Sequence, residues 1–396
     1  MKILFVHALD LSERIGGAVR CHSLANALAN EGVDVEMLAP VYSADWKSPE
    51  GAAYRLNGIR VSSGWRFCKL MIFEMKILFH ILRKSFSGEK IGLIYTRRYN
   101  PNFAPLLASK LIGCPLYVEE NGFSYRYHIH EASSSISRLK AAVMDSATFL
   151  VYRYCTKVVS VALGQQKYLE DTFGFEDSKS LLIPNSVDGV LFRPRDKYDS
   201  RKRIGIRDNA LVACFVGHLY PARGVRYMIM ALPSIVELFP DFTFIVVGKG
   251  PEEEALKALV IELGLEQYVR FFGFVEPQEV SHYIGASDFC VAPYDRTYAG
   301  SVSLSPLKIA TYLACARPIL LSDINIDMED RDKKETCVLF EPENVADLAF
   351  KINEMIGDLA RLERMSEAAI HRGNSYSWAE SAKLLQGDLS TFERSE

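Results

Sequence analysis

Short apolar runs alternate with helical patterns along the whole chain. The runs are continuous rather than alternating in polarity, which is typical of parallel strands that are buried on both faces. Strands are predicted at 2–7, 33–39, 91–96, 115–119, 157–161 and 180–183, and again at 211–216, 242–247, 269–272, 288–292, 318–321 and 337–340. Strands that alternate with helices indicate doubly wound βαβ units. The pattern therefore predicts an α/β protein with two similar parallel-sheet domains.

A length of 396 residues agrees with two domains. Proline, polar and charged residues cluster at 183–188 and 192–195, so the domains are expected at 1–190 and 191–376. A last helix over 377–396 is expected to pack back on the first domain. Ligands of open parallel sheets bind beyond the carboxyl ends of the strands. A site is therefore expected in a cleft where the two sheets face each other.

Composition narrows the classes of function. The formal net charge of −3 gives no global field that would favour nucleic acid. The eight cysteines form no C-x-x-C pair, which favours reduced core thiols and a cytoplasmic location over zinc or redox motifs. The apolar run at the amino end is short and reads as a first strand, not a signal peptide. No run reaches the roughly 18 apolar residues of a membrane span.

The stretch 212–224 carries the strongest chemical signal. An apolar run ends at Gly217, and a short loop with His218 and Arg223 leads through Gly224 to a helical pattern. Helix amino ends attract anions, and an arginine offers a fork of donors that suits phosphate oxygens. The stretch predicts a phosphate-binding loop, against the alternative of a solvated surface arginine.

Other loops follow predicted strands in the same way. Gly16 and Gly17 precede a helical run over 20–30, and Gly248, Lys249 and the Gly273–Phe274 pair follow apolar runs. Glycine lets a backbone approach a ligand closely, although each of these loops could also be a plain connection. In 300–308, Ser305 is predicted to cap a helix whose first residue is Pro306, with Lys308 near a second phosphate cradle.

Residues 65–84 form a cationic amphipathic stretch. Aromatic and aliphatic residues alternate there with lysines and arginines, and Arg97 and Arg98 follow. Such a helix can lie on an anionic membrane surface, or it can be an ordinary packed helix whose lysines face water. The stretch therefore predicts either a helix that contacts the inner face of the plasma membrane or an ordinary packed helix of the first domain.

Taken in order, these motifs resemble family 4 glycosyltransferases with the GT-B architecture, in which two Rossmann-like domains face across a cleft. The resemblance covers nearly the whole chain and implies a retaining, metal-independent transferase of the hexosyltransferase type. It implies a UDP- or GDP-sugar donor, no cofactor, and a glycan or lipid-linked acceptor in cell-surface polysaccharide or glycoconjugate synthesis. The first domain would then take the acceptor and the second the nucleotide sugar.

The resemblance also implies site residues. His218, Arg223 and Glu120 are expected to be catalytic. Donor-binding residues are expected to be Gly16, Gly17, Gly217, Arg223, Gly248, Lys249, Phe274, Ser303, Ser305, Leu307, Lys308 and Thr311. Glu120 or Asn121 would stand where the family often has a histidine near the sugar, with His128 and His130 a little further along.

The chain departs from the family at two positions. The family carries two glutamates separated by seven residues, and Ser303 and Thr311 stand in their places. A threonine hydroxyl cannot act as a charged bidentate acceptor for ribose hydroxyls. Two alternatives therefore stay open: a degenerate, non-catalytic relative that acts as a binding or scaffold subunit, and a sugar-nucleotide epimerase of related architecture.

Overall fold

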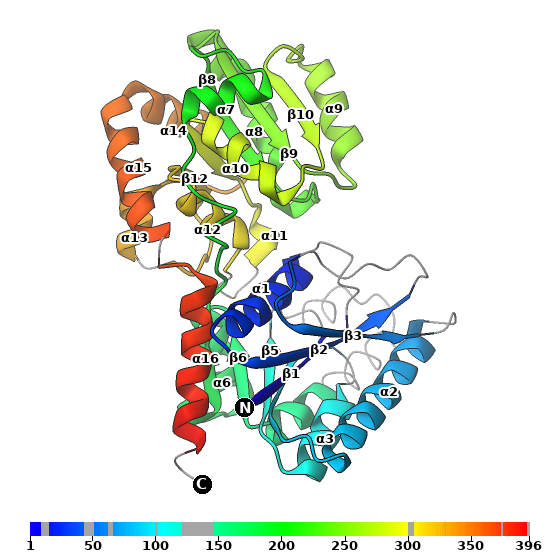
Figure 1. The fold of residues 1–396 in the computed structure, drawn as a ribbon. Helices are drawn as coiled ribbons and strands as arrows, with labels where there is room; N and C mark the ends of the chain where they lie inside the picture. The colour runs from blue at the N-terminus through cyan, green and yellow to red at the C-terminus, as the bar shows by residue number, and fades with distance from the viewer. Residues whose placement is uncertain are drawn as a thin grey trace. The chain divides into compact units, whose positions relative to one another are not determined.

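The computed structural model describes residues 1–8, 16–42, 51–61, 66–99, 102–120, 146–299, 305–328, 330–373 and 375–393. The chain forms two compact units (Figure 1). The first unit comprises Met1–Pro184 with Trp378–Glu396, and the second comprises Asn185–Ser377. The chain therefore passes between the units at 184–185 and again at 377–378. The sequence placed the first of these points at 190.

The first unit is built on a parallel sheet. Its strands are β1 (Lys2–Val6), β2 (Asp34–Val41), β3 (Arg55–Arg60), β4 (Ile91–Arg97), β5 (Leu116–Glu120), β6 (Lys157–Ser160) and β7 (Ser180–Leu182). They lie in the order β3-β2-β1-β4-β5-β6-β7, and all neighbours are parallel. The chain reverses its direction of travel across the sheet between β1 and β4, which makes this pair the topological switch point.

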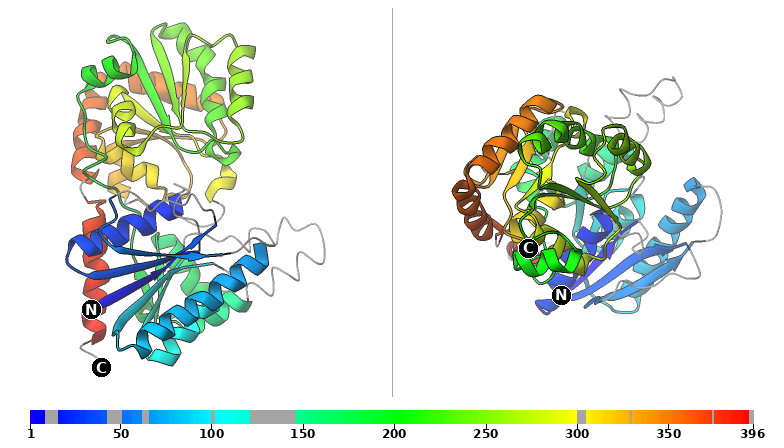
Figure 2. Two further views of the ribbon diagram at one scale, coloured as in Figure 1. Left: turned by 45° about the vertical axis from the view of Figure 1, so that its right-hand side comes forward. Right: turned by 90° about the horizontal axis from the view of Figure 1, so that it is seen from above.

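Helices cover this sheet. They are α1 (Gly16–Asn30), α2 (Arg66–Phe86), α3 (Phe103–Ile112), residues 146–154, α6 (Leu163–Phe173), a 3-10 turn at Asp177–Lys179 and α16 (Trp378–Glu393). Helix α2 buries Phe73, Ile77 and Ile81, a helical spacing of four, against one face of the sheet. Helix α3 packs beside α2, and the returning α16 packs beside α1 (Figure 2).

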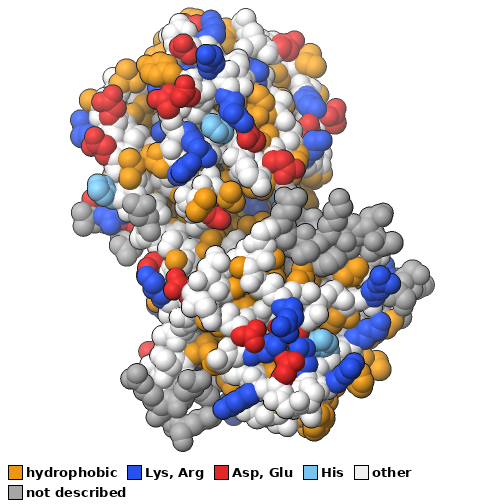
Figure 3. Space-filling model, viewed as in Figure 1, with side chains coloured by type: hydrophobic (Ala, Val, Ile, Leu, Met, Phe, Trp, Pro, Cys, Tyr) orange, Lys and Arg blue, Asp and Glu red, His pale blue; other side chains and the backbone are white. Residues whose placement is uncertain are grey.

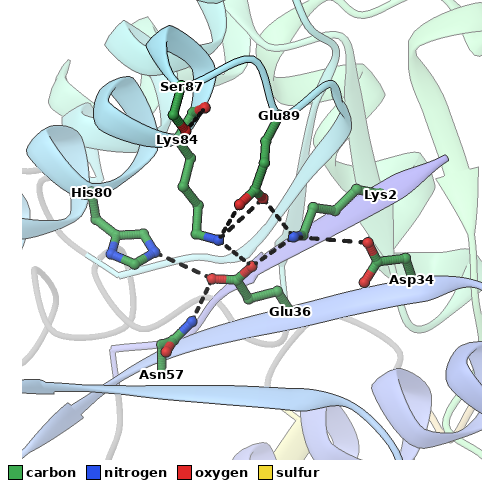
Figure 4. Close-up of polar contacts among 8 residues, drawn as sticks. All are labelled: Lys2, Asp34, Glu36, Asn57, His80, Lys84, Ser87 and Glu89. Carbon is green, nitrogen blue, oxygen red and sulfur yellow. Dashed lines mark hydrogen bonds and ion pairs between the residues drawn. The ribbon is translucent and has the colours of Figure 1, made fainter.

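An ion-pair cluster joins α2 to the sheet (Figure 4). The Glu36 carboxylate of β2 is fully buried, 3.0 Å from the Lys2 ammonium and 2.9 Å from the Lys84 ammonium. His80 lies 3.2 Å from it, and Asn57 donates a hydrogen bond to it. Burial alone would raise the pKa of Glu36, but hydrogen bonds from His80, Lys84 and Lys2 lower it below its ordinary value. The carboxylate is thus kept charged inside the unit.

The second unit repeats the plan. Its parallel strands are β8 (Leu211–Val216), β9 (Phe242–Val247), β10 (Val269–Gly273), β11 (Phe289–Ala292), β12 (Ile319–Ser322) and β13 (Cys337–Phe340), in the order β10-β9-β8-β11-β12-β13. Its helices are α7 (Lys197–Ile204), α8 (Val225–Leu238), α9 (Glu253–Glu262), α10 (Pro277–Ala286), α11 (Arg296–Ala299), α12 (Leu307–Ala314), α13 (Asp330–Thr336), α14 (Val345–Gly357) and α15 (Leu359–Gly373), with a 3-10 turn, η2, at Pro221–Arg223. Apolar cores line both faces of this sheet.

The predicted α/β class with two parallel sheets is confirmed, and each predicted strand is present within two residues of its expected bounds. One strand was missed. β3 pairs with β2 at the edge of the first sheet, and four of its six residues are polar or glycine. An edge strand buries too little to require a continuous apolar run, so hydrophobicity does not reveal it. Among the described residues, no helix is both long and apolar enough to cross a bilayer.

Candidate functional site

Three loops of the second unit are hydrogen-bonded to one another at the carboxyl edge of its sheet. The Gly217 amide donates to the Val247 carbonyl at 2.9 Å, and the Gly248 amide donates to the Gly273 carbonyl at 2.7 Å. Gly217 and Gly248 have φ of 146° and 133°, and a Cβ on Gly248 would lie 2.0 Å from the Gly217 oxygen. Only glycine fits such an approach, so these positions form a backbone-lined ledge.

Arg223 lies in the turn η2 that follows β8, and its guanidinium stacks on tyrosines. The guanidinium carbon is 4.2 Å from the Tyr298 ring centroid and 5.7 Å from that of Tyr294. The two rings are themselves stacked, with centroids 4.1 Å apart. Although burial opposes it, the tyrosines and Asp295 raise the pKa of Arg223 above its ordinary value. The guanidinium is therefore a fixed positive charge held by aromatic faces.

Lys308 of α12 reaches the same place from another element. Its ammonium lies 3.8 Å from the Phe215 ring centroid and 5.2 Å from that of Tyr294, and 3.0 Å from where a Cβ on Gly217 would be. The nitrogen is buried and donates no hydrogen bond to any of the described residues. Burial and the nearby Arg223 lower the pKa of Lys308 well below its ordinary value. The Arg223 guanidinium and the Lys308 amine thus lie near one another at the ledge, and no carboxylate of the described residues is bonded to the lysine.

The start of α12 differs from the prediction. The helix begins at Leu307, and Pro306 occupies the capping position without a side-chain hydrogen bond, one residue later than expected. Ser305 is therefore not the cap; its carbonyl accepts a hydrogen bond from the Asn185 amide instead. The Thr311 hydroxyl donates to the Leu307 carbonyl at 3.0 Å, within the helix. Ser303 lies outside the described residues.

The remaining predicted residues of this unit surround the ledge. His218 and Lys249 are exposed, and Phe274 is 55% exposed directly after β10. The Leu219 amide donates to the Lys249 carbonyl at 3.0 Å, which ties the first two loops together. The structure therefore gathers Gly217, Arg223, Gly248 and Lys308, while the side chains of His218, Lys249 and Phe274 remain open to solvent.

In the first unit the glycine pair was misplaced. Gly16 and Gly17 were expected in the loop before a helix over 20–30, but α1 begins at Gly16, so both lie in its first turn. A Cβ on Gly17 would lie 1.3 Å from Nη1 of Arg97. Gly17 is thus required because an arginine of β4 occupies the space over that turn. Close packing, rather than loop flexibility, explains the glycine.

Glu120 is buried at the end of β5. It is ion-paired with Arg98 and accepts a hydrogen bond from the Tyr152 hydroxyl. The neighbouring Glu119 is fully buried 2.9 Å from the Arg20 guanidinium. A catalytic role for Glu120 stays a prediction. Asn121, His128 and His130 lie outside the described residues.

Several residues at these edges were not singled out by the sequence. Tyr294 and Tyr298 hold Arg223, and the buried Tyr312 hydroxyl accepts from the Val216 amide at 2.9 Å, which fixes α12 against β8. Arg20 donates to the carbonyls of Ile183 and Pro184, at 2.8 and 2.9 Å. In the sequence, each of these residues is recognisable only as a polar or aromatic residue within an otherwise apolar pattern. Such a pattern does not predict which residue the side chain contacts.

Comparison with known proteins gives the class. Residues 15–189 match the family model described as Glycosyltransferase Family 4, and residues 210–358 match that of Glycosyl transferases group 1. An uncharacterized glycosyltransferase of Methanocaldococcus jannaschii is 23% identical over 384 residues, which is 93% of each chain. Among solved structures, sucrose-phosphate synthase from Thermosynechococcus elongatus has a TM-score of 0.77 at 16% identity over 100% of both chains. HepE of Anabaena in complex with UDP has a TM-score of 0.77 at 19% identity, over 99% of this chain and 100% of that one.

The matched family models and the two Rossmann-like units thus define a glycosyltransferase with the GT-B fold, an enzyme that transfers a sugar from a nucleotide sugar. The chain belongs to the family 4 glycosyltransferases, because the two family models together account for most of its length.

Proposed function

We propose that this enzyme transfers a hexose from a UDP- or GDP-sugar, with retention at the anomeric carbon and without a metal ion, to a glycan or lipid-linked acceptor of a cell-surface glycoconjugate. The observation that carries the proposal is the pairing of Arg223 with Lys308 at the Gly217 ledge, where the buried Lys308 nitrogen has no hydrogen-bond partner in the described part of the chain. Preorganised cations stabilise charge that develops on a leaving group, here the nucleoside diphosphate. Protein cations would then do the work that a metal does in other transferases.

The states of the two cations support a diphosphate as their ligand. Burial and the nearby Arg223 lower the pKa of Lys308 and so disfavour its charged form. A diphosphate would reverse this balance, since a nearby opposite charge favours the ammonium. The UDP in the HepE complex is a ligand of this chemical class.

The test compares donor use in matched variants of the full chain. Arg223→Gln and Lys308→Met are expected to lower kcat/KM for donor hydrolysis or transfer about 10- to 100-fold, because each removes a charged hydrogen bond to phosphate. Arg226→Gln, an exposed arginine in the first turn of α8, is the control and should have little effect. Reactions run with EDTA, with the product's anomeric configuration read by NMR, test metal independence and retention.

The outcomes separate the alternatives. Binding of UDP- or GDP-sugars without hydrolysis or transfer to any glycan or lipid-linked acceptor would favour the non-catalytic binding subunit. That subunit is suggested by Ser303 and by the internally bonded Thr311 hydroxyl. Conversion of the donor to an isomeric sugar nucleotide would favour an epimerase. If neither donor binds, or if Arg223→Gln behaves as the unchanged enzyme, the proposed role of the ledge is refuted.

We also propose that the first unit contacts an anionic membrane surface through α2 and α3. Helix α2 contains Lys69, Lys76 and Arg83, besides Lys84, which is ion-paired with Glu36 and Glu89. Its one acid, Glu74, is buried and accepts a hydrogen bond from the Ala104 amide. Exposed apolar side chains share these helices; they are Met75 at 70%, Phe79 at 69%, Leu107 at 49% and Leu111 at 60%. Hydrophobic and basic side chains lie next to one another on the face of this unit in Figure 3. Such a surface suits anionic lipid.

Vesicle sedimentation tests this contact. The enzyme is expected to bind vesicles of phosphatidylglycerol at low salt. Phe79→Ser should weaken this binding several-fold, because it removes apolar surface that would otherwise be buried in the lipid. Phe350→Ser, which changes a 62% exposed phenylalanine on α14 of the second unit, is the matched control. Equal binding to neutral vesicles at high salt, or an unaltered Phe79→Ser variant, would count against the membrane and favour a protein partner for this face.

A further inference from the structure

The second unit has a cavity that the proposed donor site does not use. It lies where the start of α7 and the segment before it meet α10, and its volume is about 420 Å³. Basic and acidic side chains gather over these two helices in Figure 3. A volume of this size suits a small organic ligand. The polar residues of the lining, none of which belongs to the ledge, are Arg193, Arg195, Asp196, Asp199, Ser200 and His282.

Two arginines supply the cationic part of the cavity. Nε of Arg195 donates to the Ser281 hydroxyl at 3.1 Å, which fixes the base of the guanidinium and leaves both Nη groups without a partner among the described residues. The Arg193 side chain is exposed and makes no ion pair or hydrogen bond with any residue that the structure describes. Neither arginine is therefore neutralised by the two aspartates of the same lining. Guanidinium groups with free N–H donors suit the oxygen atoms of a phosphate group.

A buried hydroxyl group in the lining has no partner. Ser200 is 0% exposed, and its Oγ makes no hydrogen bond within the described part of the chain. The oxygen lies 2.9 Å from where a Cβ on Gly285 would be, and Cβ of Arg195 lies 2.8 Å from the same point. Because position 285 of α10 has no side chain, the serine hydroxyl and the stem of the arginine come together there. Buried hydroxyl groups are nearly always hydrogen-bonded, so this one points to a ligand in the cavity.

His282 of α10 adds a second unpartnered atom. Its Nδ1 is buried and has no hydrogen-bond partner among the residues that the structure describes. Burial, followed by Arg195 and Arg203, lowers the pKa of His282 below its ordinary value, although Glu279 opposes this shift. The ring is therefore a neutral imidazole in a positive environment, and an anion in the cavity would offset that positive charge.

Two carboxylates make the lining unsuitable for a bare anion. Oδ1 of Asp196 accepts a hydrogen bond from the Asp199 amide at 2.8 Å and so caps α7. The Asp199 carboxylate is exposed and has no ion pair or hydrogen bond among the described residues. Carboxylates repel an anion but accept hydrogen bonds from hydroxyl groups. The lining thus suits a phosphate group that is attached to a compound with several hydroxyl groups.

We propose that this cavity is a binding site for a small sugar phosphate. Arg193, Arg195 and Ser200 hold the phosphate group, and Asp199 and His282 bind hydroxyl groups of the sugar. A ligand bound there joins the segment before α7 to α10, and it stabilises the second unit by mass action. The site shares no residue with the donor ledge, so it does not depend on the proposed transfer reaction.

Calorimetry with the full chain tests the site in buffers free of phosphate. The probes are glucose 6-phosphate, inorganic phosphate and glucose, and the first carries its phosphate away from the anomeric carbon, unlike a sugar donor. The Arg223→Gln variant is titrated beside the unchanged chain, because equal binding to both proteins shows that the ledge is not the site. Glucose 6-phosphate is expected to bind both proteins, about tenfold or more tightly than either of the other probes.

Matched variants of the lining identify the residues that bind. Arg193→Gln should weaken the binding of glucose 6-phosphate about tenfold, since it removes a charged hydrogen bond. Ser200→Ala should weaken it about 2- to 10-fold without lowering the Tm measured in the absence of ligand, because the hydroxyl has no protein partner to lose. A purely structural serine would lower that Tm. Lys202→Gln, which neutralises an exposed lysine of α7 outside the lining, is the control and should bind as the unchanged chain does.

The remaining outcomes separate the two halves of the ligand. Asp199→Asn should weaken the binding of glucose 6-phosphate about 2- to 10-fold but not that of inorganic phosphate. Equal affinity for glucose 6-phosphate and glucose, or for glucose 6-phosphate and inorganic phosphate, would overturn the assignment of a sugar phosphate. The site is refuted if glucose 6-phosphate does not bind Arg223→Gln. It is also refuted if Arg193→Gln and Ser200→Ala, folded as judged by circular dichroism, both bind as the unchanged chain does. Binding of UDP-sugars by Arg223→Gln reports on the ledge alone, so the two proposals can fail independently.

Discussion

Replacing His7 by glutamine should make the first unit less sensitive to acid. The His7 ring is buried at the end of β1, and burial together with Arg97 lowers its pKa from 6.5 to about 3. Above pH 6.5 the ring is neutral in both the folded and the unfolded chain. Between pH 6.5 and about 3 only the unfolded chain binds the proton, so the free energy of unfolding falls as the pH falls. Glutamine cannot bind that proton and removes this contribution.

The magnitude follows from the two pKa values. Integrating proton binding from pH 7 to pH 5 gives a loss of about 2 kcal/mol that belongs to His7 alone. Other groups, such as the carboxylates of the Glu36 cluster, titrate in both proteins and cancel in the comparison. The unchanged protein should therefore lose about 2 kcal/mol more than His7→Gln over this interval.

Tryptophan fluorescence offers a selective assay. The three tryptophans are Trp46, Trp65 and Trp378, and all belong to the first unit. Urea unfolding followed by this signal therefore reports on that unit even if the second unit unfolds separately. His371→Gln, which changes an exposed histidine of the second unit, controls for the loss of a histidine elsewhere.

One result would refute this reasoning. If the unchanged protein and His7→Gln lose the same free energy of unfolding between pH 7 and pH 5, the ring is not held neutral by burial and Arg97. A direct check is the NMR titration of the His7 ring in the folded protein, which should show no protonation down to pH 5.

Three further predictions concern aromatic and ionic contacts. Tyr298→Leu should lower kcat/KM for the donor about 3- to 30-fold by removing the ring under Arg223, whereas Tyr298→Phe keeps the ring and the rate. Arg20→Met should destabilise the first unit by about 3–5 kcal/mol in urea, because Glu119 is left as a buried charge, and Glu119→Gln in the same chain should restore part of the loss. Because the folded pKa of Glu36 is lowered, its stabilisation is present above the unfolded pKa near 4.5 and lost as the pH falls; Glu36→Gln should flatten that acid dependence of unfolding.

The architecture could be predicted because its signal is local. Buried parallel strands such as β8 and β9 are continuous apolar runs, and the glycines at their ends, Gly217 and Gly248, mark where the backbone turns. β3 was missed because an edge strand needs little burial. The start of α1 was placed too late because glycine has a poor helix propensity. Gly17 is nevertheless needed in the first turn, because the Arg97 guanidinium occupies the space of a Cβ.

The site was predictable only where one loop contains it. Arg223 follows its strand within a few residues, so its place beside the ledge could be read from the chain. The stacking of Tyr298 beneath Arg223 joins positions 75 residues apart, and the meeting of Gly17 with Arg97 joins positions 80 apart. Spacing along a chain carries no information about such contacts, because they depend on how strands are ordered in the sheet. The residue types in the sequence therefore predict which chemistry is possible, whereas the order of the strands determines which residues come into contact.

Ser303 and Thr311, which stand where the family has two glutamates, affect the charge near the proposed donor site. Helix α12 contains Lys308 and no acidic residue, and the Thr311 hydroxyl is already bonded to the Leu307 carbonyl. If the proposed ledge binds a diphosphate, a glutamate at 311 would place a negative charge on the same helix as Lys308 and oppose that binding. In that proposal, the threonine at 311 avoids this repulsion but offers no bidentate acceptor for ribose hydroxyls. We therefore expect the residue at 311 to bear on which nucleotide is chosen more than on whether a diphosphate is bound.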